Sequence, residues 1–486
     1  MTTFTFAKTF KAAIKGARTV VVVASSRLFA AKRLPKLMGR KNDALLLELA
    51  SDAKAGELGA SASTLTGGEP RRLVAVVLPT TVSRHNSPAR AECIARLVSG
   101  AVGGERGKIT IVLLLDDTDH FVAAANAVGR AFPLYSKRSG RVQAARVHIV
   151  ALDTEGVQIA APPLVRVVTA VARESAELVD TPPSELHPES FARRAKDQLK
   201  GLSGVTIKEI VGDKLLTHGL GGIHSVGRCA NSSPRLLVAT YTPRGGSGRH
   251  VALVGKGVTY DTGGLSLKIQ GHMVGMKCDM GGASAVLGAF RVLVETGCVH
   301  QLTLVLCMAE NAIGPSAYKP DDIVTLHSGK TVEINNTDAE GRLLLADGVS
   351  YAARTLRADT VFDAATLTGA QLVATGVHHA ALVSNDGDLE AHVVAAGRRS
   401  GDLVHPLPFA PEFYKREFKS AIADMRNNVE NRANAQSSCA AQFVYWHMED
   451  TKAKWCHIDL AGPAFPKGRG SGFGVALIAE AVATLA

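Results

Sequence analysis

Three charged side chains occupy alternate positions in one short stretch of the chain. Residues 335–347 read NNTDAEGRLLLAD, so Asp338, Glu340 and Arg342 come directly before an apolar run that favours a helix. If the backbone is extended up to that run, residues two apart project to the same side, and both carboxylates can face one site. Oxygen ligands of this kind suit divalent cations. The stretch therefore indicates part of a metal site, although acidic residues also cap helix N-termini without any metal.

A second, glycine-rich stretch carries two further carboxylates. Residues 252–282 read ALVGKGVTYDTGGLSLKIQGHMVGMKCDMGG, in which a strand-like run containing Lys256 is followed by Asp261, Lys268 and Asp279. Each of these charges alone is most simply an exposed loop residue. Together with the first pair they make four carboxylates, about the number that two divalent cations need when at least one carboxylate bridges them.

The elements that must position these groups alternate between strands and helices. In the second half, strands fit residues 235–241, 251–258, 302–309 and 360–365, and helices fit residues 281–295, 341–356 and 474–485. In the first half, strand-like runs at 19–24, 72–79, 108–115 and 146–151 alternate with helical patterns near 41–50, 88–99 and 120–131. Such alternation predicts an α/β fold, in which ligands gather at the carboxyl ends of strands.

The length of 486 residues predicts more than one domain. A helical stretch at 164–179 is followed by DTPPSELHP, where Pro182 and Pro183 end the helix and Pro188 suits the first turn of the next one. We therefore expect an N-terminal α/β domain over residues 1–163, a linker helix and Pro-rich connector over 164–188, and a second domain over 189–486 that carries the candidate site.

The two charged stretches resemble segments of a known enzyme family. NTDAEGRLLLAD is similar to the signature of the leucine aminopeptidase (cytosol aminopeptidase) family of two-metal exopeptidases, and VGKGVTYDTGG and MKCDMGGASAV resemble its other two metal-site segments. The similarity continues through DAATLTGA, HIDLAGPAF and KGRGSGFGVALI, and so spans about residues 165–486. The N-terminal domain agrees with the family only in architecture.

The resemblance implies an activity and an assembly. It implies a metal-dependent leucyl aminopeptidase, a hydrolase that removes Leu and other hydrophobic N-terminal residues from peptides with a free N-terminus through a two-metal-activated water. The implied fold has two domains, each a mixed β-sheet flanked by helices, with the C-terminal one catalytic. The implied cofactors are two divalent ions per subunit, Zn²⁺ and/or Mn²⁺, with Co²⁺ or Mg²⁺ as alternatives at the exchangeable site. The implied assembly is a homohexamer.

The resemblance also assigns roles to single residues. The implied ligands of the tighter metal are Lys256, Asp261, Asp279 and Glu340, and those of the more exchangeable metal are Asp261, Asp338 and Glu340. The implied catalytic groups that bind no metal are Lys268 and Arg342, of which Arg342 holds a bicarbonate that acts as the base. The implied pocket for the first side chain of the substrate consists of Met276, Thr366, Gly369 and Ala461, with a backbone contact from Leu367.

The departures from the family pattern remove no implied ligand. They are Tyr260, Thr262, Cys278 and the pair Ile269–Gln270. Lys256 must be neutral to bind a metal, and a neighbouring dication and burial both lower the pKa of a lysine. Cys278 lies beside Asp279, where a thiol can alter the metal preference or make the enzyme sensitive to oxidation.

Charge is distributed unevenly along the chain. The net charge is +11; residues 1–160 hold 23 Lys and Arg against 12 Asp and Glu, and the first 42 residues hold ten basic side chains and no acidic one. This allows a surface that binds nucleic acid or an organelle transit peptide, and a solvated basic face is the plain alternative. The strand-like run at 19–24 argues against cleavage beyond about residue 17.

The remaining composition bears on the location of the protein. The seven cysteines are scattered and never form a CxxC pair, which indicates reduced thiols inside a cell. No apolar run approaches the ~20 residues that cross a bilayer. We expect a cytoplasmic protein without a membrane segment, with a mitochondrial or other organellar location as the alternative.

Overall fold

The structure is a computed structural model that describes residues 2–30, 34–140, 144–246 and 248–485. The chain divides into two units, Met1–Arg173 with Gly397–Leu403, and Glu174–Ala396 with Val404–Ala486. This division falls inside helix α6 (Pro163–Asp180), and the sequence-based boundaries at residues 163 and 188 stay predictions. Among the helices of the described residues, none combines the length and the apolar character that crossing a bilayer requires.

The N-terminal unit is built on a seven-stranded mixed sheet with the order β1-β6-β5-β2-β4-β3, in which β7 pairs with β6. All strands are parallel to their neighbours except β3 and β7. The strands are β1 (Thr3–Phe6), β2 (Thr19–Ser25), β3 (Ala60–Leu65), β4 (Arg72–Leu78), β5 (Gly107–Leu114), β6 (Ala145–Leu152) and β7 (Gln158–Ile159). The helices are α1 (Phe10–Ile14), α2 (Ser26–Phe29), α3 (Arg40–Asp52), α4 (Ala91–Val102) and α5 (Phe121–Arg130).

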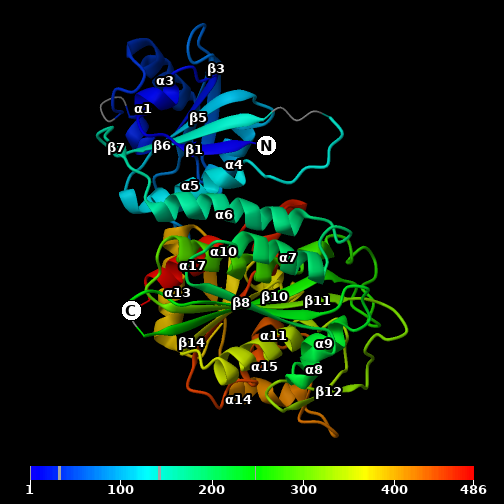
Figure 1. Cartoon of the computed structure of the whole chain (residues 1–486). Helices are drawn as coiled ribbons and strands as arrows, with labels where there is room; N and C mark the ends of the chain where they lie inside the picture. The colour runs from blue at the N-terminus through cyan, green and yellow to red at the C-terminus, as the bar shows by residue number, and fades with distance from the viewer. Residues whose placement is uncertain (1, 31–33, 141–143, 247, 486) are drawn as a thin grey trace. The chain divides into compact units, whose positions relative to one another are not determined.

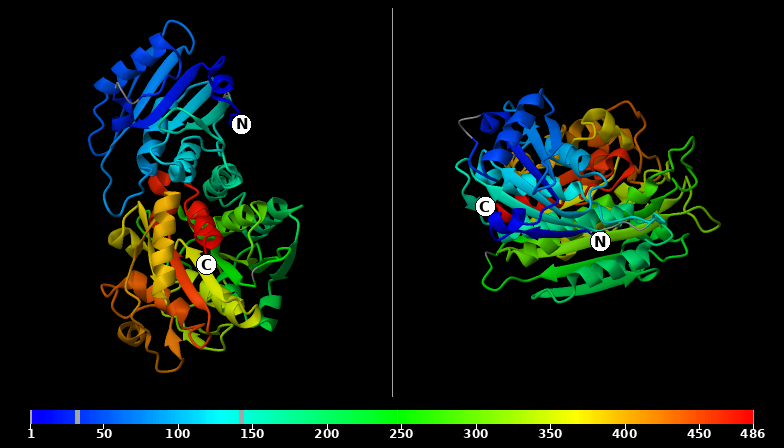
Figure 2. Two further views of the ribbon diagram at one scale, coloured as in Figure 1. Left: turned by 90° about the vertical axis from the view of Figure 1, so that its left-hand side faces the viewer. Right: turned by 90° about the horizontal axis from the view of Figure 1, so that it is seen from above.

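Strand β2 explains why this sheet has helices on both faces. All of its residues are buried, and its side chains alternate between two cores. Val21 and Val23 pack in the core that contains α4 and α5, whereas Val20 and Val22 pack in the core that contains α1, α2 and α3. A strand buried on both faces reads as a continuous apolar run, which confirms the strand predicted from VVVVA. Figure 2 shows this unit from two further sides.

The C-terminal unit is built on an eight-stranded mixed sheet with the order β16-β15-β18-β14-β10-β11-β9-β8. Its strands are β8 (Val205–Val211), β9 (Arg235–Tyr241), β10 (His250–Asp261), β11 (Gln301–Asn311), β14 (Thr360–Ala365), β15 (His379–Ser384), β16 (Leu403–Pro406) and β18 (Lys454–Asp459). A small sheet contains β12 (Ile323–Thr325), β13 (Thr331–Glu333) and β17 (Met425–Arg426). Two mixed sheets flanked by helices confirm the predicted α/β fold.

The helices of this unit lie on the two faces of the sheet. In chain order they are α7 (Pro188–Leu199), α8 (Lys214–Thr217), α9 (Gly221–Gly227), α10 (Gly281–Glu295), α11 (Gly341–Ser350), α12 (Gly369–Ala374), α13 (Gly387–Ser400), α14 (Pro411–Tyr414), α15 (Gln436–Tyr445), α16 (Ala461–Ala464) and α17 (Val475–Ala483). Helices α10 and α17 cover one face, and α9, α11 and α15 lie on the other (Figure 1).

Glycines allow α10 to lie directly on the sheet. A Cβ on Gly282, at the start of α10, would lie 2.0 Å from the carbonyl oxygen of Ala364 in β14, and a Cβ on Gly255 in β10 would lie 2.4 Å from the Cα of Ala283. Any side chain at either position would force the helix away from the strands. The close approach places the residues just before α10 at the edge of the sheet.

Four neighbouring strands end at that edge. Strand β10 is parallel to β11 and β14, and β14 is parallel to β18, so their carboxyl ends lie together. The residues at these ends are Asp261 in β10, Asn311 in β11, Ala365 in β14 and Asp459 in β18. This is the edge at which open α/β sheets hold ligands, as the sequence pattern indicated.

Candidate active site

One cavity of about 810 Å³ lies at this edge of the C-terminal sheet. Every residue to which the sequence assigned a role lines it: Lys256, Asp261, Lys268, Met276, Asp279, Asp338, Glu340, Arg342, Thr366, Leu367, Gly369 and Ala461. The structure thus brings together side chains that are up to 205 positions apart in the chain, from 256 to 461. Several lining residues had no predicted role, among them His272, Thr368, Asn428, Arg432 and Gln436.

The carboxylates form a tight buried cluster. One oxygen each of Asp261, Asp338 and Glu340 lies within 4.8 Å of the others. Asp261 and Glu340 are only 3% and 2% exposed, and Asp279 is 5% exposed. Burial raises the pKa of Asp261, Asp279 and Asp338 above the ordinary range, and neighbouring carboxylates raise each of them further. Such a cluster needs cations beside it to stay ionised.

Two lysines supply positive charge to this cluster. The Lys256 Nζ lies 2.7 Å from Asp279 Oδ1 and 2.9 Å from Glu340 Oε1, and it donates to the carbonyl oxygen of Thr366 at 2.9 Å. The Lys268 Nζ lies 2.8 Å from Asp261 Oδ2 and 2.5 Å from Asp338 Oδ1. Burial alone would lower both lysine pKa values, but the carboxylates outweigh it and raise them. Both ammonium groups are therefore protonated in this arrangement.

The donor set fits divalent metal ions. Asp279 Oδ2 is buried and has no hydrogen-bond partner among the described residues. Asp261 Oδ1 accepts from the amide nitrogen of Gly263 and from Asn311 Nδ2, both at 2.8 Å, which fixes the orientation of that carboxylate. Oriented carboxylates with a free buried oxygen are hard ligands for ions such as Zn²⁺ or Mn²⁺. A dication beside Lys256 would oppose its proton, so the amine can act as a ligand only when the ion displaces that proton.

The backbone of the signature stretch differs from the extended segment that the alternation suggested. Asp338 lies in a turn, in which the amide of Asp338 donates to Asn336 Oδ1 at 2.9 Å, and Glu340 already has helical dihedral angles as the N-cap of α11. The prediction of an extended backbone is therefore wrong, because the asparagine side chain closes a local turn. Glu340 makes no side-chain capping bond, so its carboxylate remains directed at Lys256.

Arg342 is buried, and no acidic side chain among the described residues forms an ion pair with it. It is 4% exposed, its Nη1 donates to the carbonyl oxygen of Asn427 at 2.9 Å, and its Nε has no hydrogen-bond partner among the described residues. Burial lowers the pKa of Arg342 to about 10, so the guanidinium remains charged at neutral pH. A buried guanidinium with unused donors suits a small planar anion such as bicarbonate.

Asn427 holds both this arginine and the signature turn. It is fully buried, and its Nδ2 donates to the carbonyl oxygen of Asn336 at 2.7 Å while its Oδ1 accepts from the amide of Asn335 at 2.9 Å. Sequence reasoning missed it, because nothing in its neighbourhood distinguishes it from an ordinary loop asparagine.

Asp459 likewise fixes the loops that contain Leu367 and Ala461. Its Oδ1 accepts from the amides of Leu367 at 3.0 Å and Ala461 at 3.3 Å, and its Oδ2 accepts from Thr368 Oγ1 at 2.7 Å. Two segments with predicted pocket residues are thus tied to one buried carboxylate. Thr366 Oγ1 also donates to Asp279 Oδ1 at 2.9 Å, which joins the pocket to the metal-site cluster.

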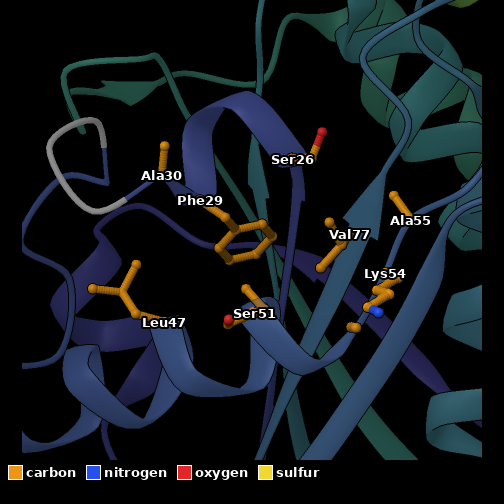
Figure 3. Close-up of a pocket in the computed structure, with 10 residues that line it drawn as sticks. Ser26, Phe29, Ala30, Leu47, Ser51, Lys54, Ala55 and Val77 are labelled. Carbon is orange, nitrogen blue, oxygen red and sulfur yellow. The ribbon is translucent and has the colours of Figure 1, made fainter.

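A second cavity, of about 460 Å³, lies in the N-terminal unit between α2, α3 and β4 (Figure 3). Phe29, Leu47 and Val77 give it an apolar lining, and Ser51 and Lys54 are among its few polar groups. Its lining contains no carboxylate among the residues that the structure describes. None of the residues to which the sequence assigned a role lines this second cavity.

Two family models match the chain. Residues 173–479 match the catalytic domain of the cytosol aminopeptidase family, and residues 42–141 match the M17 aminopeptidase N-terminal domain 2. The chain is 46% identical over 409 residues to a probable aminopeptidase, NPEPL1, of Mus musculus, covering 82% of this chain and 77% of that protein. It is 40% identical over 404 residues to leucine aminopeptidase 1 of Caenorhabditis elegans, covering 83% and 82%.

Solved structures agree with these matches over both units. The leucyl aminopeptidase of Trypanosoma cruzi has a TM-score of 0.91 at 37% identity, covering 99% of this chain and 96% of that one. The leucyl aminopeptidase of Trypanosoma brucei in complex with bestatin has a TM-score of 0.89 at 37% identity, covering 99% and 94%. With a catalytic-domain match over more than half of its length and relatives of this similarity, the chain belongs to the cytosol aminopeptidase family.

Proposed function

We propose that this metal-dependent aminopeptidase hydrolyses the first peptide bond of peptides with a free N-terminus, with Leu and other hydrophobic first residues preferred. The observation that carries the proposal is the cluster of Asp261, Asp338 and Glu340, whose oxygens lie within 4.8 Å of one another in a cavity that also contains two lysines and a buried arginine. This is the combination of groups that two-metal hydrolysis uses.

Five residues would hold the two ions. Lys256, Asp261, Asp279 and Glu340 would bind the tighter one, and Asp261, Asp338 and Glu340 the exchangeable one, so Asp261 and Glu340 would bridge. Zn²⁺ and Mn²⁺ are the ions proposed, with Co²⁺ or Mg²⁺ as alternatives at the exchangeable position. Bound divalent ions supply Lewis acidity, which polarises a carbonyl oxygen and lowers the pKa of water.

Lys268 and Arg342 have proposed catalytic roles that do not require metal binding. The raised pKa of Lys268 keeps its ammonium charged, so it can stabilise negative charge on the substrate carbonyl oxygen. Arg342 would hold a bicarbonate through its unused donors, and a bicarbonate bound there would supply a general base. Asn427 fixes the guanidinium in that position.

The first residue of the substrate would occupy the pocket of Met276, Thr366, Gly369 and Ala461, with a backbone contact from Leu367. A methionine gives such a pocket an adaptable apolar surface, which favours Leu, Met and similar side chains. A free α-amine would approach the acidic cluster, which an acetylated nitrogen cannot do because it has lost its basicity. Leucinamide should therefore be cleaved and N-acetyl-leucinamide resist cleavage. Efficient cleavage of the acetylated compound would contradict the exopeptidase assignment.

The central experiment measures hydrolysis of leucine anilide by the purified protein. Activity should disappear after dialysis against a chelator and return when Mn²⁺, Zn²⁺ or Co²⁺ is added. Full activity of protein shown by elemental analysis to contain no metal would contradict the metal-dependent mechanism.

We further propose a homohexamer that acts in the cytoplasm. Support for the location comes from relatives such as a probable cytosol aminopeptidase of Leifsonia xyli subsp. xyli, 41% identical over 305 residues. The acid-free N-terminal segment also contributes β1 and the fully buried β2 to the sheet, which favours a folded role over an organelle signal within those strands. The organellar alternative predicts that a fluorescent fusion of the full chain colocalises with mitochondria.

A second candidate function is nucleic-acid binding by the N-terminal unit. Exposed arginines stand at the amino ends of four parallel strands: Arg18 before β2, Arg71 before β4, Arg106 before β5 and Arg146 in β6. Because these strands are parallel neighbours, their amino ends share one edge of the sheet. Retention of the full chain on DNA should fall steeply with salt, and an R18Q/R146Q variant should show a shallower dependence. Absence of retention at low salt would rule this function out.

A further inference from the structure

The active-site cavity contains one arginine that the proposed chemistry does not use. We propose that Arg432 binds a carboxylate on the leaving-group side of the substrate, so that very short peptides, whose C-terminal carboxylate lies close behind the scissile bond, are preferred. This inference rests on the aminopeptidase function proposed above and adds the class of leaving group.

The acidic side chains of the cavity are paired with its lysines. All four carboxylates of the metal-site cluster lie beside Lys256 or Lys268, at 2.5 to 2.9 Å. Arg342 is accounted for by its proposed anion. Arg432 also lines the cavity, and across the described ranges no hydrogen bond or ion pair engages its side chain. The cavity therefore has an unused cation that faces the space where the substrate must lie.

A fixed turn holds the backbone of this arginine. Arg432 is the second residue of a turn closed by a hydrogen bond from the amide of Asn434 to the carbonyl oxygen of Asn431 at 3.1 Å. Glu417 holds the turn, because its Oε2 accepts from the amide of Asn431 at 3.2 Å and its Oε1 from Asn434 Nδ2 at 2.8 Å. Both oxygens of this neighbouring acid are thus engaged by amides. Glu417 therefore fixes the turn at Asn431 and Asn434, and the guanidinium of Arg432, which lies between them in the chain, remains available to bind a ligand.

The turn also has a defined place in the cavity wall. It lies between Asn427, which holds Arg342 and the signature turn, and Gln436, the first residue of α15. Asn428 and Gln436 line the cavity together with Arg432. The proposed pocket for the first side chain is formed by other segments, so this wall is left for the part of the peptide that departs. The guanidinium of Arg432 alone offers several donors to one carboxylate, and amide side chains line the same wall.

The test compares four substrates that differ in the carboxylate. Leu-Gly has a C-terminal carboxylate, Leu-Gly amide has none, Leu-Glu amide has one only on a side chain, and leucine anilide has neither a carboxylate nor a second residue. We expect kcat/KM of the wild type to be about tenfold higher for Leu-Gly than for its amide, mainly through KM, as one charge-assisted hydrogen bond would give. Leu-Glu amide distinguishes a side-chain carboxylate from the chain terminus: a gain over Leu-Gly amide indicates that either source is bound, and no gain indicates the terminus alone.

Variants separate this role from a structural one. R432Q should lose the preference for Leu-Gly over Leu-Gly amide and R432K should keep part of it, while hydrolysis of leucine anilide stays unchanged in both. The matched control is R416Q, which removes an exposed arginine from the short 3-10 helix Lys415–Phe418, outside the cavity lining, and should keep the full preference. A preference that persists in R432Q would overturn the proposal. Failure of the wild type to cleave any of the four substrates would instead contradict the aminopeptidase function.

Discussion

At the scale of single residues, the site consists of buried charged groups of opposite sign, each of which needs the others to stay ionised. Asp261, Asp279 and Glu340 are each at most 5% exposed, and isolated carboxylates at such depth would be protonated. The ammonium groups of Lys256 and Lys268 compensate them in the structure described above. Divalent ions would take over that compensation, so the loss of one bridging carboxylate must change both ion content and charge balance.

The first prediction concerns these bridging carboxylates. D261A and E340A should each abolish hydrolysis of leucine anilide and lower the metal content measured by elemental analysis, because each variant removes a ligand proposed to contact both ions. Circular dichroism checks that the variants are folded. Normal turnover with full metal occupancy in either variant would end the two-metal assignment.

The second prediction concerns Arg342, whose proposed role is to hold an anion rather than a metal. R342A should keep its metal content and lose about 100-fold in kcat, the size expected when a general base is no longer positioned. R342K retains the positive charge but not the planar guanidinium with its paired donors. The kcat of R342K should therefore lie between those of the wild type and R342A. Loss of the metals from R342A would show that the arginine serves the metal site instead.

The residues of the site could be predicted in part from the sequence. Asp338, Glu340 and Arg342 were found because charged residues of this kind rarely stand together before an apolar helix. Asn427 and Arg432 could not be found in this way, because their roles arise from contacts with segments about 90 residues earlier or from a cavity that exists only in the folded chain. The cluster of acids was predicted, but the turn that shapes it was not.

At the scale of elements, strands with apolar runs were predictable, whereas the interior strands β15 and β18 and the edge strand β3 were not predicted. Strand β2 is buried along its whole length and has an almost entirely apolar sequence, and β14 is equally buried although it contains Thr360 and Asp363. Strand β3 reads ASASTL and has one half-exposed and one exposed face, so its small polar residues give no signal of a strand. Its conformation is set by pairing with β4, which the sequence of β3 alone does not reveal.

The third prediction tests the close approach of α10 to the sheet. G282A should destabilise the C-terminal unit by about 3 kcal/mol, because the new Cβ would overlap the carbonyl oxygen of Ala364. The measurement is denaturant unfolding followed by tryptophan fluorescence. The control is G387A at the start of α13, where a Cβ meets nothing within 4 Å and stability should change little. Equal stability of the two variants would contradict the described packing.

At the scale of the whole molecule, buried titratable groups set the range of pH in which the fold persists. His447 is fully buried, and burial together with the charges of Lys330 and Arg354 lowers its pKa to about 3. The folded state thus favours the neutral imidazole, whereas the unfolded chain has the ordinary value near ~6.5. The stabilisation is present above pH ~6.5 and is lost as the pH falls toward 3, because the unfolded state then binds the proton.

The fourth prediction follows from the loss of this stabilisation as the pH falls. Between pH 6.5 and pH 4.5, wild-type protein should lose about 2 kcal/mol of unfolding free energy through His447, and H447Q should lose that much less over the same range. The comparison uses urea unfolding at each pH. H378Q changes an exposed histidine and should follow the wild type. Parallel curves for wild type and H447Q would show that His447 does not contribute.

The fifth prediction concerns assembly. If the proposed hexamer forms, light scattering should report a mass about six times the 51.0 kDa of the chain. A fully active species with the mass of one chain would contradict the hexamer and leave the site unaffected.

The way in which the cavity is assembled also bears on the order of events when the chain folds. Its lining extends from Lys256 on β10 to Ala461 after β18, so no continuous fragment shorter than about 200 residues contains all of it. Contacts between segments so far apart form late, since the loops between them must close first. A chain still emerging from the ribosome therefore lacks the last strand of the site and cannot cut peptides. During refolding, activity should return only with the final closure of the sheet, later than the recovery of helical structure.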